Sequence, residues 1–296
     1  MALMWRCAGL RWSAGGPALM WSGGRRSALT WGKRVAFGVV EGGGRTCAGA
    51  RGHACPGGAA VPGRSTGARC GECARLDRAH SVAADTIADD PRPYRVYLAW
   101  FGPGLVKVGI TGAERGPARL LEQGAVCFSW LGTGPLMAAR RTEELLRAAL
   151  GVPDRIPYGR KRAVRAGLPG TREERAAEIA ELHGRAVALG GWPDSLTPAP
   201  FRAVDHLDAF GLGGTEGGAA AVGEVTELVA GGEIGGELVA AAGPDLHLVT
   251  ERGVVVLDTR LMTGWELVAA EGGRRAFPVR EFRESRDSAG DQGSLF

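Results

Sequence analysis

Residues 95–111 read RVYLAWFGPGLVKVGIT, and this stretch decides the fold of the chain's centre. Two apolar runs flank the Gly-Pro-Gly turn at 102–104, so the stretch predicts a β-hairpin. Side chains alternate between the two faces of a strand, which puts Lys107 and Gly109 on one face of the second strand. In the register that so short a turn allows, Tyr97 lies opposite Gly109, with Lys107 on the diagonal. We therefore expect unoccupied space above Gly109, beside a phenol and an ammonium group.

Further elements follow the hairpin in the order helix, strand, helix. They are predicted at residues 117–123, 125–131 and 136–150. Pro135 before the last helix and Gly151 after it mark its two ends. A long helix rich in Arg and Glu is predicted at 172–189. Helices and strands of this kind indicate an α+β fold.

One carboxylate interrupts the apolar side of the helix at 136–150. An apolar stripe runs along this helix at Leu136, Ala139, Leu146 and Leu150. Glu143 falls where the next member of the stripe belongs, and a buried carboxylate is costly unless it is paired or holds a cation. Two hypotheses remain open. Glu143 binds a divalent cation, or it pairs with Arg140 or Arg147 on the same helix.

The centre of the chain resembles the GIY-YIG nuclease superfamily over about residues 94–150. In that family a Tyr on each of the first two strands frames the site, a helical Arg binds phosphate, and a Glu on the later helix holds a divalent metal. The matching positions here are Tyr97, Arg119 and Glu143. Lys107 stands where the second Tyr would be. The resemblance implies a central β-β-α-β-α domain.

The resemblance also implies metal-dependent cleavage of phosphodiesters in DNA, with Mg²⁺ or Mn²⁺ at Glu143 and phosphate at Arg119. Arg115 is the other candidate for the arginine. Such hydrolysis needs a cation to neutralise the phosphate and a carboxylate to hold a metal, and these residues supply both. Because Lys107 replaces a Tyr, the second hypothesis is a DNA-binding or clamp-adaptor protein without activity. A third hypothesis is a metal-stabilised scaffold for protein partners only.

Four cysteines lie in a Gly-rich segment that has no apolar periodicity. They are Cys47, Cys55, Cys70 and Cys73. Zinc takes four tetrahedral thiolate or imidazole ligands, and a Cys-x-x-Cys turn can place two of them on one ion. The segment therefore predicts a closed, structural Zn²⁺ site, although His53 could replace Cys55, and redox-active thiols are an alternative. Cys7 and Cys127 lie in apolar strands, where we expect core residues.

The chain as a whole is similar to an uncharacterised bacterial family that carries domain of unknown function 2797. The cysteine cluster and the sequence EQGA at residues 122–125 carry this similarity, which implies an architecture and no activity. We expect an N-terminal antiparallel β module with a zinc loop at residues 1–84, a GIY-YIG-like domain at 94–168, a long helix at 171–189, a small β-rich domain at 201–283 and a flexible tail at 284–296.

The tail ends in Gln292-Gly293-Ser294-Leu295-Phe296. It resembles the bacterial sliding-clamp-binding peptide, which implies the replication clamp as a partner. Leu295 and Phe296 could fill an apolar pocket while Gln292 forms hydrogen bonds at its rim. An accidental match of five residues is the alternative.

Charge is distributed unevenly along the chain. Residues 1–200 hold 28 basic and 16 acidic side chains, whereas residues 201–296 hold 8 and 16. The basic part is compatible with a polyanion such as DNA. A merely solvated surface is the alternative, because 33 Arg against 3 Lys indicates a GC-rich genome.

Neither the first residues of the chain nor its apolar runs predict a membrane as partner. Arg6 and Arg11 interrupt the start before a signal peptide's apolar region could form. The longest uncharged run, at residues 123–139, is shorter than the roughly 20 apolar residues that a membrane helix needs. We expect a cytoplasmic protein, in whose reducing compartment six cysteines indicate metal binding more than disulfides.

Overall fold

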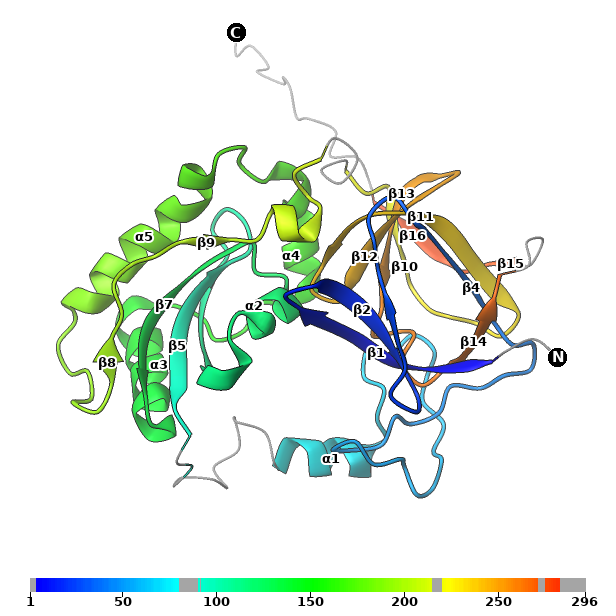
Figure 1. Cartoon of the computed structure of the whole chain (residues 1–296), viewed down its shortest axis with the longest axis horizontal. Coiled ribbons are helices and arrows are strands. Elements are labelled where there is room, and N and C mark those ends of the chain that lie inside the picture. Colours follow the sequence, from blue (N-terminus) through cyan, green and yellow to red (C-terminus); the bar gives the residue numbers. More distant parts are fainter. Residues whose placement is uncertain (1–3, 80–89, 91, 215–219, 271–274, 283–296) are drawn as a thin grey trace, which may run out of the picture.

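The structure of the chain is a computed structural model, and it describes residues 4–79, 90, 92–214, 220–270 and 275–282. Helices and strands are both abundant, which confirms the α+β class. Two sheets build two lobes that meet at α2 and α4 (Figure 1). None of the described helices is long and apolar enough to cross a membrane.

The elements have the following bounds. The large sheet contains β1 (Trp5–Ser13), β2 (Gly16–Trp21), β3 (Arg26–Ala28), β4 (Arg34–Val39), β10 (Gly223–Val225), β11 (Gly232–Ala242), β12 (Asp245–Thr250), β13 (Gly253–Asp258), β14 (Glu266–Ala269), β15 (Arg275–Ala276) and β16 (Val279–Glu281). The small sheet contains β5 (Tyr94–Trp100), β6 (Val106–Gly112), β7 (Cys127–Gly134), β8 (Thr197–Pro198) and β9 (Val204–Asp205). The helices are α1 (Gly71–Ala79), α2 (Ala118–Gln123), α3 (Leu136–Leu150), α4 (Tyr158–Val164) and α5 (Arg172–Ala188), with short 3-10 turns η1 (Ala113–Arg115), η2 (Arg165–Gly167) and η3 (Asp208–Phe210).

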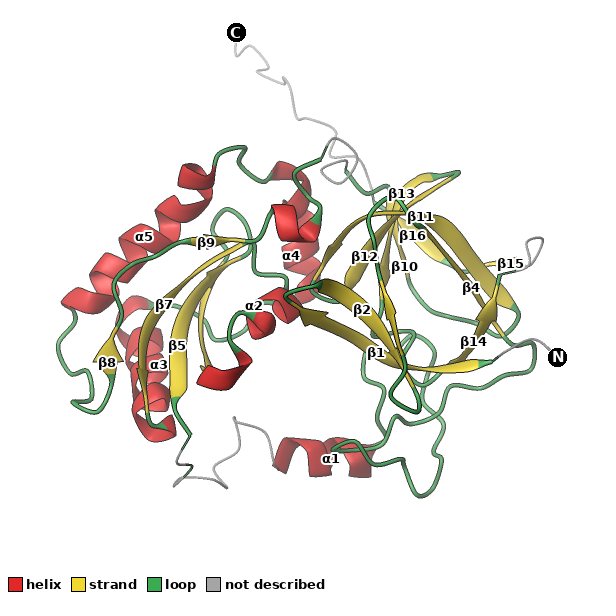
Figure 2. Cartoon of the chain, viewed as in Figure 1, coloured by secondary structure: helices red, strands yellow, loops and turns green. Residues whose placement is uncertain are grey.

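The small sheet has the strand order β6-β5-β7-β8, and β9 also pairs with β7. Alternation along β5 gives it two buried faces. Val96, Leu98 and Trp100 belong to the core that includes residues of α3 and α5, and these two helices cover that face (Figure 2). Tyr97 and Ala99 point the other way, into a second core that includes Leu120 of α2.

The hairpin has the predicted register. Tyr97 pairs with Gly109, and the amide of Phe101 donates a hydrogen bond to the carbonyl of Leu105 at 3.0 Å. The space above Gly109 is occupied, however. The Tyr97 phenol lies over this glycine, where a Cβ would overlap the ring. The missing side chain makes room for the phenol, not for a ligand.

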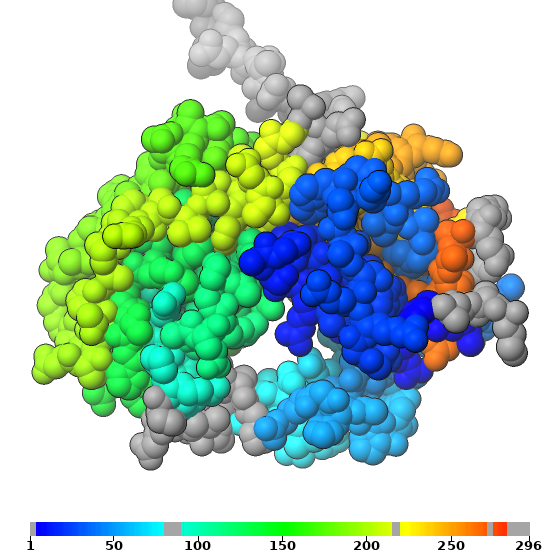
Figure 3. Space-filling model, in the orientation of Figure 1, coloured from blue at the N-terminus to red at the C-terminus, as the bar shows by residue number. Residues whose placement is uncertain are grey.

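The large sheet joins segments that are far apart in the sequence. Its strand order is β16-β10-β13-β12-β11-β4-β14-β1-β2-β3, and β15 also pairs with β11. Strand β4 lies between β11 and β14, and Trp5 of β1 pairs with Leu267 of β14. The predicted module at 1–84 and the predicted β-rich domain at 201–283 therefore share one sheet and one core. Figure 3 shows the first strands (dark blue) at the surface between the central lobe (green) and the cysteine-bearing loop (light blue to cyan).

Some predicted segments differ from the structure. The sequence also predicts a helix at 74–88; in the structure this helix begins earlier, at Gly71, and residues 80–89 lie outside the described part of the chain. The Gly- and Pro-containing stretch at 190–200 predicts a linker, but it contributes β8, which pairs with β7 and so extends the small sheet. Helix α4 was not expected, because its short sequence has no apolar stripe.

Candidate functional site

Tyr97, the first predicted site residue, lies in the core. Its side chain is 1% exposed, and its hydroxyl accepts a hydrogen bond from Nε2 of Gln123, at the end of α2, at 2.9 Å. Burial raises the pKa of Tyr97, while the Gln123 hydrogen bond and the charge of Arg119 lower it less. The phenol is therefore neutral at pH 7.

Lys107 is a buried cation beside this phenol. It is 9% exposed, and its Nζ lies 5.7 Å from the centre of the Tyr97 ring. Nζ donates a hydrogen bond to the backbone carbonyl of Asp154 at 3.0 Å. Burial, followed by the charge of Arg119, lowers the pKa of Lys107 to about 8, although Glu143 and Asp154 act in the opposite direction. The ammonium group is thus mostly charged at pH 7, yet it can release a proton at little cost.

The guanidinium of Arg119, on α2, acts through its charge on Tyr97 and Lys107. Its side chain is 44% exposed, and its Nη1 lies 3.9 Å from Oε2 of Glu122. Arg115 lies much closer to the same carboxylate oxygen, at 2.6 Å. Glu122 therefore holds Arg115, while the charge of Arg119 lowers the pKa of both Tyr97 and Lys107.

Glu143 lies at the border of the buried side of α3 and is half-buried. The centre of that side is Thr142, which is 0% exposed and whose Oγ1 donates to the carbonyl of Ala138 at 3.0 Å. Leu136, Ala139 and Leu146 of the predicted stripe are buried, but Thr142 rather than Glu143 completes it. Burial raises the pKa of Glu143, and the charge of Lys107 lowers it.

Arg147, one of the two partners predicted for Glu143 within its own helix, has another partner. Arg147 binds Glu144 instead, at 2.6 Å. The charges of Arg147 and Arg140 lower the pKa of Glu143.

Arg119 and Glu143 lie close enough to Tyr97 and Lys107 for their charges to act on both. Arg119 and Glu143 each change the pKa of Tyr97 and of Lys107. They come from α2, α3, β5 and β6, which the small sheet brings to one place. The charges of Arg119 and of the half-buried Glu143 therefore reach both Lys107 and the neutral Tyr97 phenol.

Asp154 is a second carboxylate that acts on Glu143, and no pattern in the sequence predicts it. It follows α3 in a loop that is fixed beside β6, because the amide of Val108 donates to the carbonyl of Pro153 at 3.0 Å. The charge of Asp154 raises the pKa of Glu143. Mg²⁺ is commonly bound by one or two carboxylates and several waters, so these two side chains suit it.

Helix α4 contacts the C-terminal end of α2 through hydrogen bonds. Lys161 is 3% exposed and donates from Nζ to the carbonyl of Gln123 at 3.0 Å. Its ammonium group lies 3.8 Å from the centre of the Phe101 ring and 4.4 Å from that of Tyr158. The Tyr158 hydroxyl donates to the carbonyl of Glu122 at 3.2 Å. The position of Gln123, and with it that of the Tyr97 phenol, therefore depends on α4.

Buried ion pairs fasten α4 to the large sheet. Arg162 lies 2.6 Å from Asp245, 2.5 Å from Asp258 and 3.0 Å from Glu224. Arg165 lies 2.6 Å from Asp245, which is 0% exposed. Charged hydrogen bonds of this geometry are stronger than neutral ones and need fixed partners. They join the candidate site's lobe to the other lobe.

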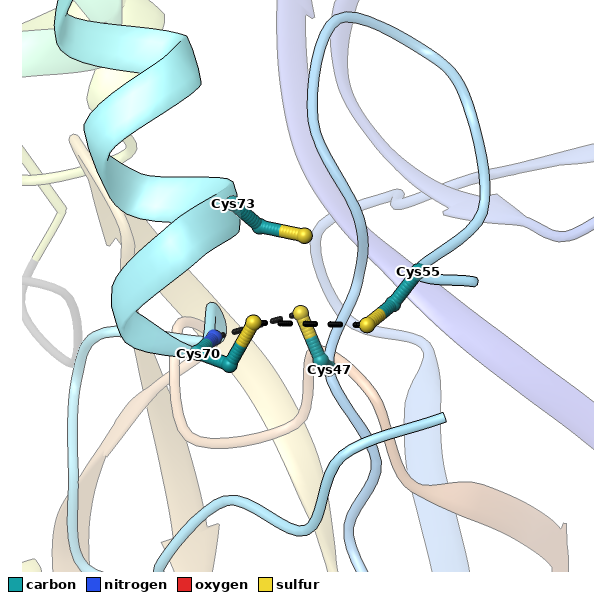
Figure 4. Close-up of side chains that lie close together, drawn as sticks. All are labelled: Cys47, Cys55, Cys70 and Cys73. Carbon is teal, nitrogen blue, oxygen red and sulfur yellow. Dashed lines mark hydrogen bonds between the residues drawn. The ribbon is translucent and has the colours of Figure 1, made fainter. Parts of the chain in front are cut away.

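The four cysteines of the Gly-rich segment come together next to α1 (Figure 4). They are Cys47, Cys55, Cys70 and Cys73. All four sulfur atoms lie within 4.8 Å of one another, and those of Cys55 and Cys70 are 4.0 Å apart. The Cys47 sulfur accepts hydrogen bonds from the amides of Gly49 at 3.3 Å and Cys70 at 3.2 Å.

This cluster can hold a metal ion. A tetrahedral zinc site with Zn–S bonds of about 2.3 Å has sulfur atoms about 3.8 Å apart, close to the observed spacing. Hydrogen bonds from the amides of Ala59 and Gly57 lower the pKa of Cys55 to about 7. Burial and the three neighbouring thiols raise the pKa of Cys73 to about 12. The raised pKa of Cys73 reflects repulsion between negatively charged sulfur atoms, which a bound cation would reduce.

Arg45 attaches the cysteine-bearing loop to the large sheet. It is 2% exposed, and its guanidinium donates to the carbonyls of Pro62, Arg260 and Thr263 at 2.8 Å and of Ser65 at 2.5 Å. In the sequence it was one arginine among many. Its importance comes from contacts with a turn more than 200 residues away.

Other predicted residues lie apart from these two places. His53 is exposed and is not part of the cysteine cluster. Cys7 and Cys127 are 1% and 0% exposed in strands, so their prediction as core residues is confirmed. Gln292, Leu295 and Phe296 lie outside the described residues.

Comparison with known proteins finds one family. A family model described as "Protein of unknown function (DUF2797)" matches residues 32–267, which include the hairpin, the four cysteines and Glu143. No curated protein and no solved structure matches the chain.

Proposed function

The chain belongs to the DUF2797 family, and from that premise we propose that it is a DNA-associated protein that cleaves phosphodiesters with a divalent cation at Glu143. The proposal rests on two observations: the charges of Arg119 and Glu143 act on the pKa values of Tyr97 and Lys107, and the Lys107 ammonium group lies beside the Tyr97 ring. The resemblance of the sequence to GIY-YIG nucleases assigns roles to the same four positions.

Each residue has a chemical task in this proposal. Glu143, with Asp154 beside it, would hold Mg²⁺ or Mn²⁺, which would lower the pKa of a water ligand and neutralise charge on the phosphate. Arg119, partly exposed, binds the phosphate oxygens. Lys107 stabilises negative charge as it develops and, with a pKa of about 8, can give a proton to the leaving oxygen. Tyr97 closes the floor of the site.

Cleavage of labelled DNA tests the activity. We would incubate the full chain with single-stranded, duplex and branched DNA, with Mg²⁺, with Mn²⁺ and with a chelator. Glu143→Gln should reduce cleavage at least 100-fold, since the variant keeps the shape of the side chain but loses its charge. Glu144→Gln is the matched control, because Glu144 is exposed and paired with Arg147. Equal loss in both variants, or cleavage without a divalent cation, would contradict the proposal.

One observation favours a second function, DNA binding without cleavage. The Tyr97 phenol is 1% exposed, is bound to Gln123 and has a raised pKa, so it offers no base to a substrate. A chain with this function would bind the DNA panel and leave every substrate intact. The same assay therefore separates the two functions.

We further propose that the four cysteines hold a structural Zn²⁺. Four thiols at tetrahedral spacing, all supplied by the protein, support a closed site without an open ligand position. The segment around them has a small apolar core, centred on Val61, so the ion would supply much of its stability.

A last part of the proposal concerns the tail, where Gln292, Leu295 and Phe296 would bind the replication clamp. Its support is the sequence alone. Short peptides of this kind bind with roughly micromolar affinity. A labelled peptide of residues 285–296 should bind purified clamp, and Phe296→Ala should weaken binding at least tenfold. A flat titration to high micromolar clamp would remove this partner.

A further inference from the structure

Arg95 of β5 is a half-buried cation that the candidate site leaves unused. Its guanidinium lies over the ring of Trp130 of β7, with Cζ 5.0 Å from the centre of the ring. In the described part of the chain, no hydrogen bond or ion pair joins this guanidinium to another residue. An arginine carries five N–H donors, and donors that lie partly inside a protein need acceptors. The donors of Arg95 are therefore left for water or for a ligand.

Strand pairing places Arg95 on the face of the small sheet that carries the Tyr97 phenol. The two residues are two positions apart on β5, so their side chains share a face. Thr111 of β6 and Thr133 of β7 pair with Arg95, and residues directly opposite one another in an antiparallel pair share a face too. Helices α3 and α5 cover the other face of the sheet (Figure 2). Arg95 thus lies between two hydroxyl-bearing residues, in the row next to that of Tyr97.

Trp130 connects this arginine to the candidate site. The centre of its ring lies 6.2 Å from that of Tyr97 and 5.1 Å from that of Phe128, and both ring pairs meet edge to face. These contacts fix the ring over which the Arg95 guanidinium lies. A contact between a cation and a ring holds the guanidinium without neutralising its charge, and N–H donors remain for an anion.

The acidic residue in the turn after β6 does not neutralise Arg95. This residue, Glu114 of η1, pairs with Arg92 at 3.3 Å. Arg119, the proposed phosphate ligand, acts through its charge on Tyr97. Two arginines therefore lie near the same phenol, one on α2 and one on β5, and neighbouring cations of this kind attract a polyanion.

We propose that Arg95 binds a second phosphate of the nucleic acid whose first phosphate lies at Arg119, while the Trp130 ring holds the guanidinium in place. A nucleic-acid strand carries a phosphate on every nucleotide, so a strand bound at one arginine brings further phosphates to the surface around it. Arginine binds phosphate oxygens with two parallel N–H bonds. Thr133, which is half-buried, offers a hydroxyl beside it. Because the substrate is the one proposed above, this role of Arg95 rests on the proposed function.

Fluorescence anisotropy tests this contact, with labelled (dT)15, a labelled 15-base-pair DNA duplex, the full chain and a chelator that prevents cleavage. Arg95→Gln should weaken binding about fivefold or more. Loss of one phosphate contact should also reduce the slope of log K against log salt, by about 0.7 for the single strand or about 0.9 for the duplex. Thermal unfolding of the variant should match that of the unchanged chain.

Arg25→Gln is the matched control. Arg25 also lies over a tryptophan ring, 4.7 Å from the centre of Trp5, but it belongs to the turn between β2 and β3 in the other lobe. Its loss should leave binding within about twofold and the salt slope unchanged, because no phosphate contact is removed. An equal loss in both variants would mean that only the total charge matters, which would overturn the proposal.

A double variant separates the role of Trp130 from simple packing. Trp130→Leu should weaken binding, because the Arg95 guanidinium loses the ring that holds it. In a chain that already carries Arg95→Gln, Trp130→Leu should cause little further loss, because the ring acts through the arginine. Losses that simply add would overturn the proposal.

The cleavage assay described for Glu143→Gln makes the two proposals fail in different ways. A chain that binds DNA through Arg95 and cleaves no substrate supports this contact and contradicts the proposed cleavage. A chain that cleaves DNA, and whose Arg95→Gln variant keeps its affinity and salt slope, overturns this contact and leaves the proposed cleavage intact. Absence of DNA binding by the unchanged chain would also overturn the contact.

Discussion

Tyr97 occupies the space that a side chain at residue 109 would need. We expect Gly109→Ala to lower the free energy of unfolding by about 1–3 kcal/mol, because its Cβ would overlap the phenol in a packed core. Urea unfolding measures the change. The displaced ring should also lose its hydrogen bond from Gln123.

Gly112→Ala in the same strand is the control for this prediction. A Cβ there lies 3.6 Å from Glu114, which is an ordinary contact. We expect a change of less than about 0.5 kcal/mol. If the two variants are equally stable, the phenol does not occupy the position that the structure gives it.

Lys161 should make stability depend on pH. Burial lowers its pKa in the folded chain from 10.5 to about 7, with the charge of Lys107 as the next cause. Between these two pH values the unfolded chain binds a proton that the folded chain lacks, so the free energy of unfolding rises with pH. Lys161→Met should reduce this rise, by an amount on the order of a few kcal/mol.

The chain has only 3 lysines, which makes the titration directly visible. In a protein labelled with 13C at the lysine ε-carbon, one resonance should titrate near pH 7 and be absent from Lys161→Met. A second, from Lys107, should titrate near pH 8. Three lysines that all titrate above pH 10 would contradict both assignments.

At the scale of the element, the ends of a helix and the register of a hairpin depend on residues that are close in the sequence, and these features could be predicted. Helix α3 was predicted to the residue, because Pro135 cannot continue a helix backwards and Gly151 adopts the left-handed conformation that ends one. The hairpin register followed from its short turn. The predicted stripe of α3 is buried at Leu136, Ala139 and Leu146, but Thr142 and not Glu143 lies at its centre, because the spacing of the apolar residues allows either position.

Other elements depend on distant partners and were not predictable in this way. The one buried residue of α4 is the charged Lys161, so no apolar period marks the helix. Its stability comes from contacts with α2 and with carboxylates of the large sheet. Asp154 was missed for the same reason, since only the pairing of its loop with β6 brings it to the site.

The loop that carries the cysteine cluster should depend for its fold on the proposed Zn²⁺. We expect about one zinc ion per chain, and removal by a chelator should unfold the loop and make residues 45–79 sensitive to proteases. Elemental analysis and limited proteolysis measure the two effects. Cys55→Ser should lose the metal, whereas His53→Ala, two residues away and exposed, should keep it. Protein that contains no metal and resists proteolysis after chelation would contradict the site.

At the scale of the whole molecule, Arg162 joins the two lobes. Arg162→Met leaves Asp258 and Glu224 without this partner at a buried position. Breaking a buried pair from one side costs about 3–5 kcal/mol. We expect calorimetry to show a lower melting temperature and two transitions in place of one, because the lobes then unfold separately.

Arg147→Met provides the comparison. It removes an exposed pair with Glu144, and such pairs contribute less than about 1 kcal/mol. A similar loss of stability in both variants would mean that α4 does not connect the lobes through charge.

The pairing of β1 with β14 also has a consequence for the order of folding during synthesis. Trp5 leaves the ribosome about 260 residues before its partner Leu267, a delay on the order of tens of seconds at typical rates of translation. Strands β5, β6 and β7 meet their partners within a short length of chain, so the central lobe can fold while β1 and β4 still wait. A nascent chain therefore presents unpaired strand edges at its start until its last strands emerge, and those edges are where we expect a chaperone to bind.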